Sequence, residues 1–185
     1  MKLLEEDMLA PAAGHFDCLK WAREHGCDWN TKTCEAAARG GHLHILRWSR
    51  ENGCDWDSET CSWAAKRGHL DCLKYARENG CDWNSKTCSD AAGMGHLNCL
   101  KYARENGCAW NSETTKEAVQ YGRLDILQWA VNNDCEFNPV ECLEIAVKSY
   151  KRDSKIISFL REKIRSSSIR LNMEQTLLLL YSEKM

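Results

Sequence analysis

Apolar and polar positions along this chain follow a pattern that returns every 27 residues. From Asp82 to Cys108 the order is DWNSKTCSDAAGMGHLNCLKYARENGC, and closely similar stretches begin at Asp55 and at Asp28. A more divergent copy begins at Ala109. A fixed period of this length is typical of repeat arrays, in which each unit buries its apolar face against the next one. We therefore expect a single stack of similar units.

Each copy contains the signals of two short helices. Asn84 supplies a side-chain oxygen that can cap the first helix, which we expect over residues 86–92. The segment 93–95 is rich in glycine and is expected to break that helix. A second helix is expected over residues 97–106, where apolar residues follow helical spacing, and Gly107 is expected to end it in a left-handed conformation. One repeat is thus two antiparallel helices and a short extended link.

The whole chain, residues 1–185, is interpreted as one domain. Residues 1–29 are an incomplete copy with an acidic first half, and we expect them to form an N-terminal capping repeat whose first helix ends near Pro11. Residues 30–137 hold four repeats. Residues 138–185 are a degenerate last repeat followed by a C-terminal capping helix.

Composition excludes several classes of protein. The net charge is −2, with 25 basic and 27 acidic residues, so no overall attraction to nucleic acid or to an anionic membrane is expected. No apolar run reaches the roughly 18 residues that a membrane span requires. The N-terminal stretch lacks the features of a secretion signal, so the predicted location is the cytosol, or the nucleus by diffusion.

The twelve cysteines fall into three columns at the repeat spacing. Because Ile and Thr occupy some of these positions in other copies, the columns favour buried structural thiols. No short Cys or His spacing typical of zinc is present, and a column of Gly-His pairs is interpreted as helix-start hydrogen bonding. A thiol sensor or metal-binding protein remains the alternative interpretation. The columns are Cys27, Cys54, Cys81, Cys108 and Cys135; Cys34, Cys61, Cys88 and Cys142; and Cys18, Cys72 and Cys99.

Two aromatic columns are predicted to lie in the core rather than in a ligand site. One column occupies the link and the other occupies the second helix. They are Trp29, Trp56, Trp83, Trp110 and Phe137, and Trp21, Trp48, Tyr75, Tyr102 and Trp129.

The repeat resembles the ankyrin repeat, whose core pattern is TPLHLAAxxGHLEVVKLLLEAGADVN. The matching features are an Ala-Ala pair, a Gly-His turn, two second-helix leucines and a Gly-x-Asp-x-Asn exit. In this chain they are Ala91 and Ala92, Gly95 and His96, Leu97 and Leu100, and Gly80, Asp82 and Asn84. The likeness covers roughly residues 10–150, and it is greatest to the short, Cys- and Trp-rich ankyrin-type arrays of protists and large DNA viruses.

The resemblance implies an all-α, ankyrin-like solenoid, but the period of 27 residues is shorter than the ankyrin period of about 33. The missing residues fall where ankyrin repeats build β-hairpins, so we expect hairpins to be shortened or absent. We hypothesise that the link tryptophans, such as Trp83, fill the volume that a hairpin would have framed.

Candidate binding residues come from comparing the copies with one another. The second helix hardly varies, whereas the first helix and the turn after it vary strongly. Ankyrin-like stacks place the first helix on the concave face, so we predict that a partner binds there. Trp63 stands outside both aromatic columns and is expected to face solvent as an anchor. The predicted partner-binding residues are Glu35, Arg39, Ser62, Trp63, Lys66, Arg67, Ser89, Asp90, Met94, Glu117, Gln120 and Tyr121.

No catalytic constellation is present: the chain has neither a phosphate-binding Gly-rich loop with Lys nor a nucleophile elbow. The sequence therefore predicts a non-enzymatic protein–protein interaction module, of scaffold or adaptor type. We expect it to be monomeric, to need no cofactor or metal, and to bind one or more proteins rather than nucleic acid or membrane. An Arg column on the second helices is the feature that a nucleic-acid alternative would use, and interspersed acidic residues argue against it.

Overall fold

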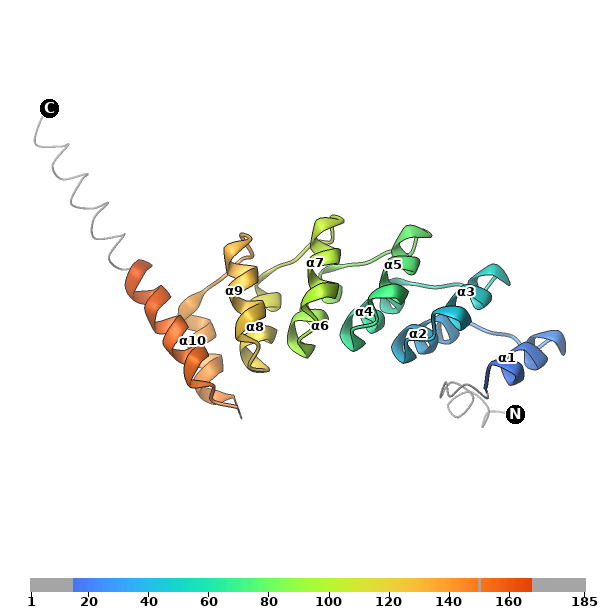
Figure 1. Ribbon diagram of the computed structural model, residues 1–185, viewed down its shortest axis with the longest axis horizontal. Helices are drawn as coiled ribbons and strands as arrows, with labels where there is room; N and C mark the ends of the chain where they lie inside the picture. Colours follow the sequence, from blue (N-terminus) through green and yellow to red (C-terminus); the bar gives the residue numbers. More distant parts are fainter. Residues whose placement is uncertain (1–14, 150, 168–185) are drawn as a thin grey trace, which may run out of the picture.

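The computed structural model describes residues 15–149 and 151–167, which form a curved row of helix pairs (Figure 1). A further helix covers residues 154–167, and the described residues contain no strand. The predicted N-terminal helix before Pro11 and the C-terminal helix from Met173 lie outside the described residues. The labelled helices are α1 (His15–Glu24), α2 (Thr31–Gly40), α3 (Leu43–Glu51), α4 (Ser58–Arg67), α5 (Leu70–Glu78), α6 (Ser85–Met94), α7 (Leu97–Glu105), α8 (Ser112–Gln120), α9 (Leu124–Asn132) and α10 (Pro139–Lys148).

The first helices, α2, α4, α6, α8 and α10, all begin at a polar capping residue. The Asn84 side chain accepts a hydrogen bond from the Lys86 backbone N–H at 3.0 Å, and its backbone is extended. This bond satisfies one of the backbone donors that a helix start leaves unpaired. The same bond recurs at Asn30, Asp57, Asn111 and Asn138.

The first helix of the central repeat is longer than the sequence pattern predicted. Gly93 and Met94 are helical, so the expected break over residues 93–95 is wrong, and the helix ends only at Gly95. Gly95 has φ 91°, a left-handed conformation that favours glycine, and its N–H closes the helix on Ala91 and Ala92. Gly93 is buried inside the helix because an acidic side chain of the next repeat packs against it.

Small residues set the curvature of the array. The Ala-Ala pair of α2, α4 and α6, for example Ala64 and Ala65, is buried, and so are the second-helix leucines Leu73 and Leu100. Because small side chains let helices approach closely, neighbouring first helices contact one another far more than neighbouring second helices do. The first helices therefore lie on the inner, concave side and the second helices on the outer side (Figure 1).

The link tryptophans join consecutive second helices across the wider spacing. The guanidinium of Arg77 in α5 lies over the Trp83 ring, 4.7 Å from its centroid. The Trp83 ring also contacts the ring of Tyr102 in α7 edge to face, with 6.2 Å between the ring centroids. Equivalent Arg–Trp contacts recur along the array, so the Arg column of the second helices serves packing. They are Arg23 with Trp29, Arg50 with Trp56, and Arg104 with Trp110.

The Gly-His column starts the second helices through backbone hydrogen bonds, such as the one that the His69 carbonyl accepts from the Leu73 N–H at 3.0 Å, and its side chains also hold repeats together. His42, His69 and His96 precede the second helices but make no side-chain cap. Instead the His69 ring N–H donates to the backbone carbonyl of Arg39, at the end of the previous first helix, with 3.2 Å between Nε2 and O. Where the column changes to Arg123, its Nε donates to a carbonyl of the previous repeat in the same way.

Candidate interaction surface

We define the first-helix face as the inner surface formed by α2, α4, α6, α8 and α10. Every N-cap places the following residues in the same helical register, so the variable positions of different repeats line up across neighbouring helices. Three of the twelve predicted residues are exposed and seven are half-buried on this face. The exposed ones are Arg39, Arg67 and Gln120, and the half-buried ones are Trp63, Lys66, Ser89, Asp90, Met94, Glu117 and Tyr121.

The remaining two predicted residues are packing residues. Glu35 is only 6% exposed, and both its carboxylate oxygens accept hydrogen bonds from Lys32 Nζ at 2.8 and 2.9 Å. Ser62 is 1% exposed, and its hydroxyl lies 3.4 Å from that of Thr87 in the next repeat. Since neither side chain can be reached from solvent in this arrangement, we remove both from the contact set.

Trp63 lies half-buried on the first-helix face, with two cations over its ring. The Arg39 guanidinium of the preceding helix is 5.5 Å from the ring centroid, and the Lys66 ammonium is 5.4 Å from it. Cations attracted to an aromatic face hold its orientation. Trp63 therefore does not project freely into solvent, as the sequence suggested, but presents part of a ring that is already held in place.

Ion pairs cross from one repeat to the next on this face. Lys66 Nζ lies 3.2 Å from an Asp90 carboxylate oxygen, and Lys86 Nζ lies 2.7 Å from one of Glu59. These pairs are partly exposed, so each contributes at most about 1 kcal/mol to stability. They neutralise most of the charge in the middle of the face.

Among the acidic residues of the first-helix face, Glu117 has a shifted side-chain pKa. Burial raises its pKa, and the nearby Asp90 carboxylate raises it further, while Lys66 acts in the opposite direction. Its side chain packs against the backbone of Gly93. A larger residue at position 93 would displace it.

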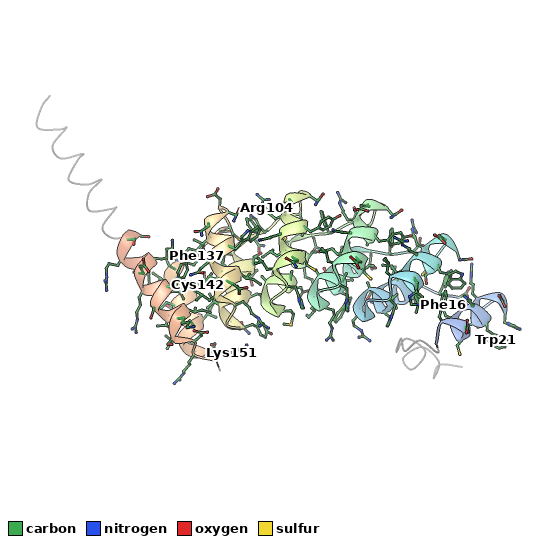
Figure 2. The ribbon with its side chains drawn as sticks, viewed as in Figure 1. Phe16, Trp21, Arg104, Phe137, Cys142 and Lys151 are labelled. Carbon is green, nitrogen blue, oxygen red and sulfur yellow. The ribbon has the colours of Figure 1, made fainter. Side chains whose placement is uncertain are left out.

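Three exposed apolar residues were not predicted as contacts. Val140 and Val147 on α10 are 53% and 46% exposed, at positions that carry charged or polar side chains in most other copies. Comparing the copies in frame would therefore have identified these two valines as candidate contact residues. Trp21 is 60% exposed, against the expected core role, because α1 ends the described array (Figure 2).

The cysteines are arranged for packing rather than for reactivity. Ten are buried, while Cys18 and Cys27 near the N-terminal end are exposed. The Cys81 thiol donates to the backbone carbonyl of Asp57 at 3.1 Å, a bond that recurs in other repeats. Burial raises the pKa of Cys72 to about 11, as it does for Cys99. A raised pKa disfavours the reactive thiolate at these two residues, and burial shields all ten enclosed thiols from reagents, which argues against the thiol-sensor alternative.

Contact between thiols was missed by the sequence comparison, which considered each column by itself. Cys61 hydrogen-bonds with Cys81 of the adjacent column, and this contact together with burial raises the pKa of Cys61. The same pairing raises the pKa of Cys34 and Cys88 and lowers that of their buried partners Cys54 and Cys108. Within the described ranges no group of three or more His, Cys, Asp or Glu side chains is arranged to hold a metal ion.

Comparison with known proteins gives a match in structure only. No protein-family model matches the chain, and no curated protein matches it in sequence. Among solved structures, the crystal structure of the human ASB11 ankyrin repeat domain is similar, with a TM-score of 0.65 and 17% sequence identity over 88% of this chain and 83% of that chain. The likeness confirms the predicted all-α, ankyrin-like solenoid fold. Among residues 15–149 and 151–167, no helix combines the length and apolar content needed to cross a membrane.

Proposed function

We propose that the chain is a protein–protein interaction module that binds its partner through the first-helix face. The observation that carries this proposal is the division of each repeat. The residues that join repeats, such as Arg77 and Trp83, stay nearly constant, whereas accessible residues on the inner face change from copy to copy. Solenoids expose extended concave surfaces for binding, and positions that the fold does not dictate are available for specificity.

Trp63 is proposed as the anchor of the contact. Trp and Arg dominate the binding energy of protein interfaces, particularly where they are already ordered before binding. Trp63 is in contact with the cations of Arg39 and Lys66, so little side-chain freedom remains to be lost. Val147 extends the same face at its other end with exposed apolar surface.

The role that fits such a surface is that of a scaffold or the substrate-binding part of an adaptor, without catalysis. We further propose a monomer that acts in the cytosol, or in the nucleus, on protein partners rather than on nucleic acid or membrane. Its short repeat places it, on this proposal, with the compact ankyrin-like arrays of protists and large DNA viruses.

The test is a selection of binders followed by mapping. A displayed library of natural protein segments is selected against the parent chain, and each binder's Kd is measured. The double variant Trp63→Ala, Arg67→Ala is expected to weaken the binders by about tenfold or more, which corresponds to about 1.4 kcal/mol. The control Trp21→Ala, Arg161→Ala removes the same two residue types outside the first-helix face and is expected to leave the Kd within about twofold.

Both variants are first compared with the parent by thermal unfolding, so that a loss of binding is not a loss of structure. Equal weakening by the two variants would place the contact elsewhere. A selection that yields no specific binder would contradict the interaction module itself.

A further inference from the structure

The first-helix face is electrically polarised along the array. Counting Lys and Arg against Asp and Glu, the net charge is +1 for α2 and α4, zero for α6, and −1 for α8 and α10. The second helices α3, α5, α7 and α9 carry +1, 0, +1 and −1, which is no gradient. The charge therefore falls steadily on the inner face alone.

At the basic end, two guanidiniums lack an acidic partner. Lys66 is paired with Asp90 at 3.2 Å, but Arg39 and Arg67 form no ion pair with any residue that the structure describes. Arg67 lies one helical turn from Trp63, so the two share a face. These three cations and one ring form a single cluster at the ends of α2 and α4.

Helix stability alone does not explain this basic cluster. Basic residues in a last turn do favour the negative end of the helix dipole. However, α6 and α8 have no basic residue in their last turns, where they carry Met94 and Gln120, and both form the same helix in the same array. The fold thus does not require the charges of Arg39 and Arg67 at these positions.

At the acidic end, the balance is reversed. Lys116 is shared between Glu113 at 3.2 Å and Glu141 at 2.8 Å. Glu117, Glu144 and the last-turn Lys148 form no ion pair within the described part of the chain, and α8 and α10 together keep a net charge of −2. The two ends of the face therefore carry net charges of opposite sign, separated by the paired residues of the middle.

We propose that the first-helix face binds a protein segment of matching polarity, with its acidic residues over Arg39, Trp63 and Arg67 and its basic residues over Glu117 and Glu144. This inference rests on the proposed function and names the chemistry of the partner. Packed helices are about 10 Å apart, so α4 and α10 are separated by about 30 Å, which an extended segment spans in about nine residues. A nucleic acid, anionic along its whole length, would be repelled by the acidic end.

A second copy of this chain is a poorer match. Two copies arranged antiparallel would pair opposite charges, but two concave surfaces facing each other cannot fill the space between them. A flexible protein segment can follow the inner curve and bring its side chains to both ends.

The experiment uses synthetic peptides and the full chain. One labelled peptide of about 20 residues carries an acidic block, a neutral spacer of about eight residues and a basic block, in keeping with the spacing above. A second peptide has the same composition with acidic and basic residues alternating. The expected result, by fluorescence anisotropy at low salt, is that the block peptide binds at least about fivefold more tightly. Equal affinities would overturn the inference.

Charge reversal assigns the orientation. Arg39→Glu with Arg67→Glu is expected to weaken the block peptide by about tenfold or more, while an all-basic peptide gains affinity for this variant. Arg161→Glu with Arg165→Glu makes the same change of charge on the helix over residues 154–167 and is expected to change the block peptide's Kd by less than about twofold. Equal effects of the two variants would show only a non-specific attraction and would overturn the inference.

Two further outcomes would assign the face to another occupant and also refute the proposal. One is tighter binding of a single-stranded DNA oligonucleotide than of the block peptide. The other is a dimer of the parent chain in light scattering that the Arg39→Glu, Arg67→Glu variant abolishes. If library binders compete for the first-helix face but show no charge polarity, the proposed function stands and this inference fails.

Discussion

Trp83→Ala is expected to separate two second helices that have little other contact. The Trp83 ring lies between Arg77 of α5 and Tyr102 of α7 and packs against the hydrophobic core. Alanine at this position would leave a gap at the outer side of the array, where helix–helix contact is already sparse. The hypothesis that link tryptophans fill the volume of a missing hairpin depends on this loss being large.

The magnitude follows from three contributions. A tryptophan buries about 150–250 Å² when enclosed, and Trp83 is half-buried, so about 100 Å² is at stake, or about 2.5 kcal/mol at about 25 cal/mol per Å². The edge-to-face contact with Tyr102 contributes about 0.5–1.5 kcal/mol, and the cation over the ring about 0.5–1 kcal/mol. Because part of the surface stays covered after substitution, we expect a loss of about 3 kcal/mol.

The assay is guanidinium chloride unfolding followed by circular dichroism. For a chain of this size, the free energy of unfolding falls by about 4 kcal/mol per molar guanidinium chloride, so the midpoint of the unfolding transition should fall by about 0.7 M. The matched control is Trp21→Ala, which removes an exposed ring at the end of the described array and should cost less than about 1 kcal/mol. Arg77→Ala is expected to be less destabilising in Trp83→Ala than in the parent, because only the hydrogen bond from Arg77 to the Cys81 carbonyl then remains to be lost.

A loss of less than about 0.5 kcal/mol for Trp83→Ala would refute the space-filling hypothesis. Equal losses for Trp83→Ala and Trp21→Ala would do the same, because position in the array would then not matter.

Three other outcomes are expected. Glu117→Gln should stabilise the chain at neutral pH and not at acidic pH. Burial and Asp90 raise the pKa of Glu117, so the parent loses stability as the pH rises through that pKa. Unfolding at both pH values checks this, and a stability difference that does not change with pH would contradict it. His96→Arg should reduce the loss of stability on acidification. Burial lowers the pKa of His96, so the contribution of this residue to the free energy of unfolding is lost as the pH falls through that pKa. An unchanged dependence of that free energy on pH between pH 7.5 and 5.5 would contradict this. A thiol reagent should react fast with Cys18 and Cys27 and slowly with the ten buried thiols until denaturant is added, and many fast thiols in the native chain would revive the sensor alternative.

The sequence predicted the helix pairs well because the signals that set them are local. Asn84 caps α6 through a bond to a residue two positions away, and Gly95 ends the same helix by its own backbone conformation. Such interactions are complete within a few residues: the Asn or Asp cap recurs in the first helices from α2 to α10, and the left-handed glycine recurs at the ends of α2 and α4. The alanine and leucine positions were likewise visible as helical spacing, and the structure buries them.

Contacts between repeats were harder to predict, because one period contains no information on what lies beside it. His69 reaches a carbonyl of the preceding repeat, and Cys61 meets the thiol of another column. Glu35 and Ser62 stand at variable positions and yet are buried, and the Ser62 hydroxyl lies against that of Thr87 in the next repeat. Trp21 shows the opposite case: its column is a packing column, but its place at the end of the described array leaves it exposed.

The repeats divide stability and recognition between opposite sides of the array, and this division makes the binding surface testable. On the outer side, Trp83 and its equivalents connect consecutive helices through extensive ring contacts. On the inner side, the accessible charges form partly exposed pairs such as Lys66 with Asp90, or no pair at all, as for Arg39 and Arg67. Exposed charges of this kind contribute little to folding. Reversing them should therefore change which segment binds while the solenoid stays folded, which is what a module that recognises different partners through one fold requires.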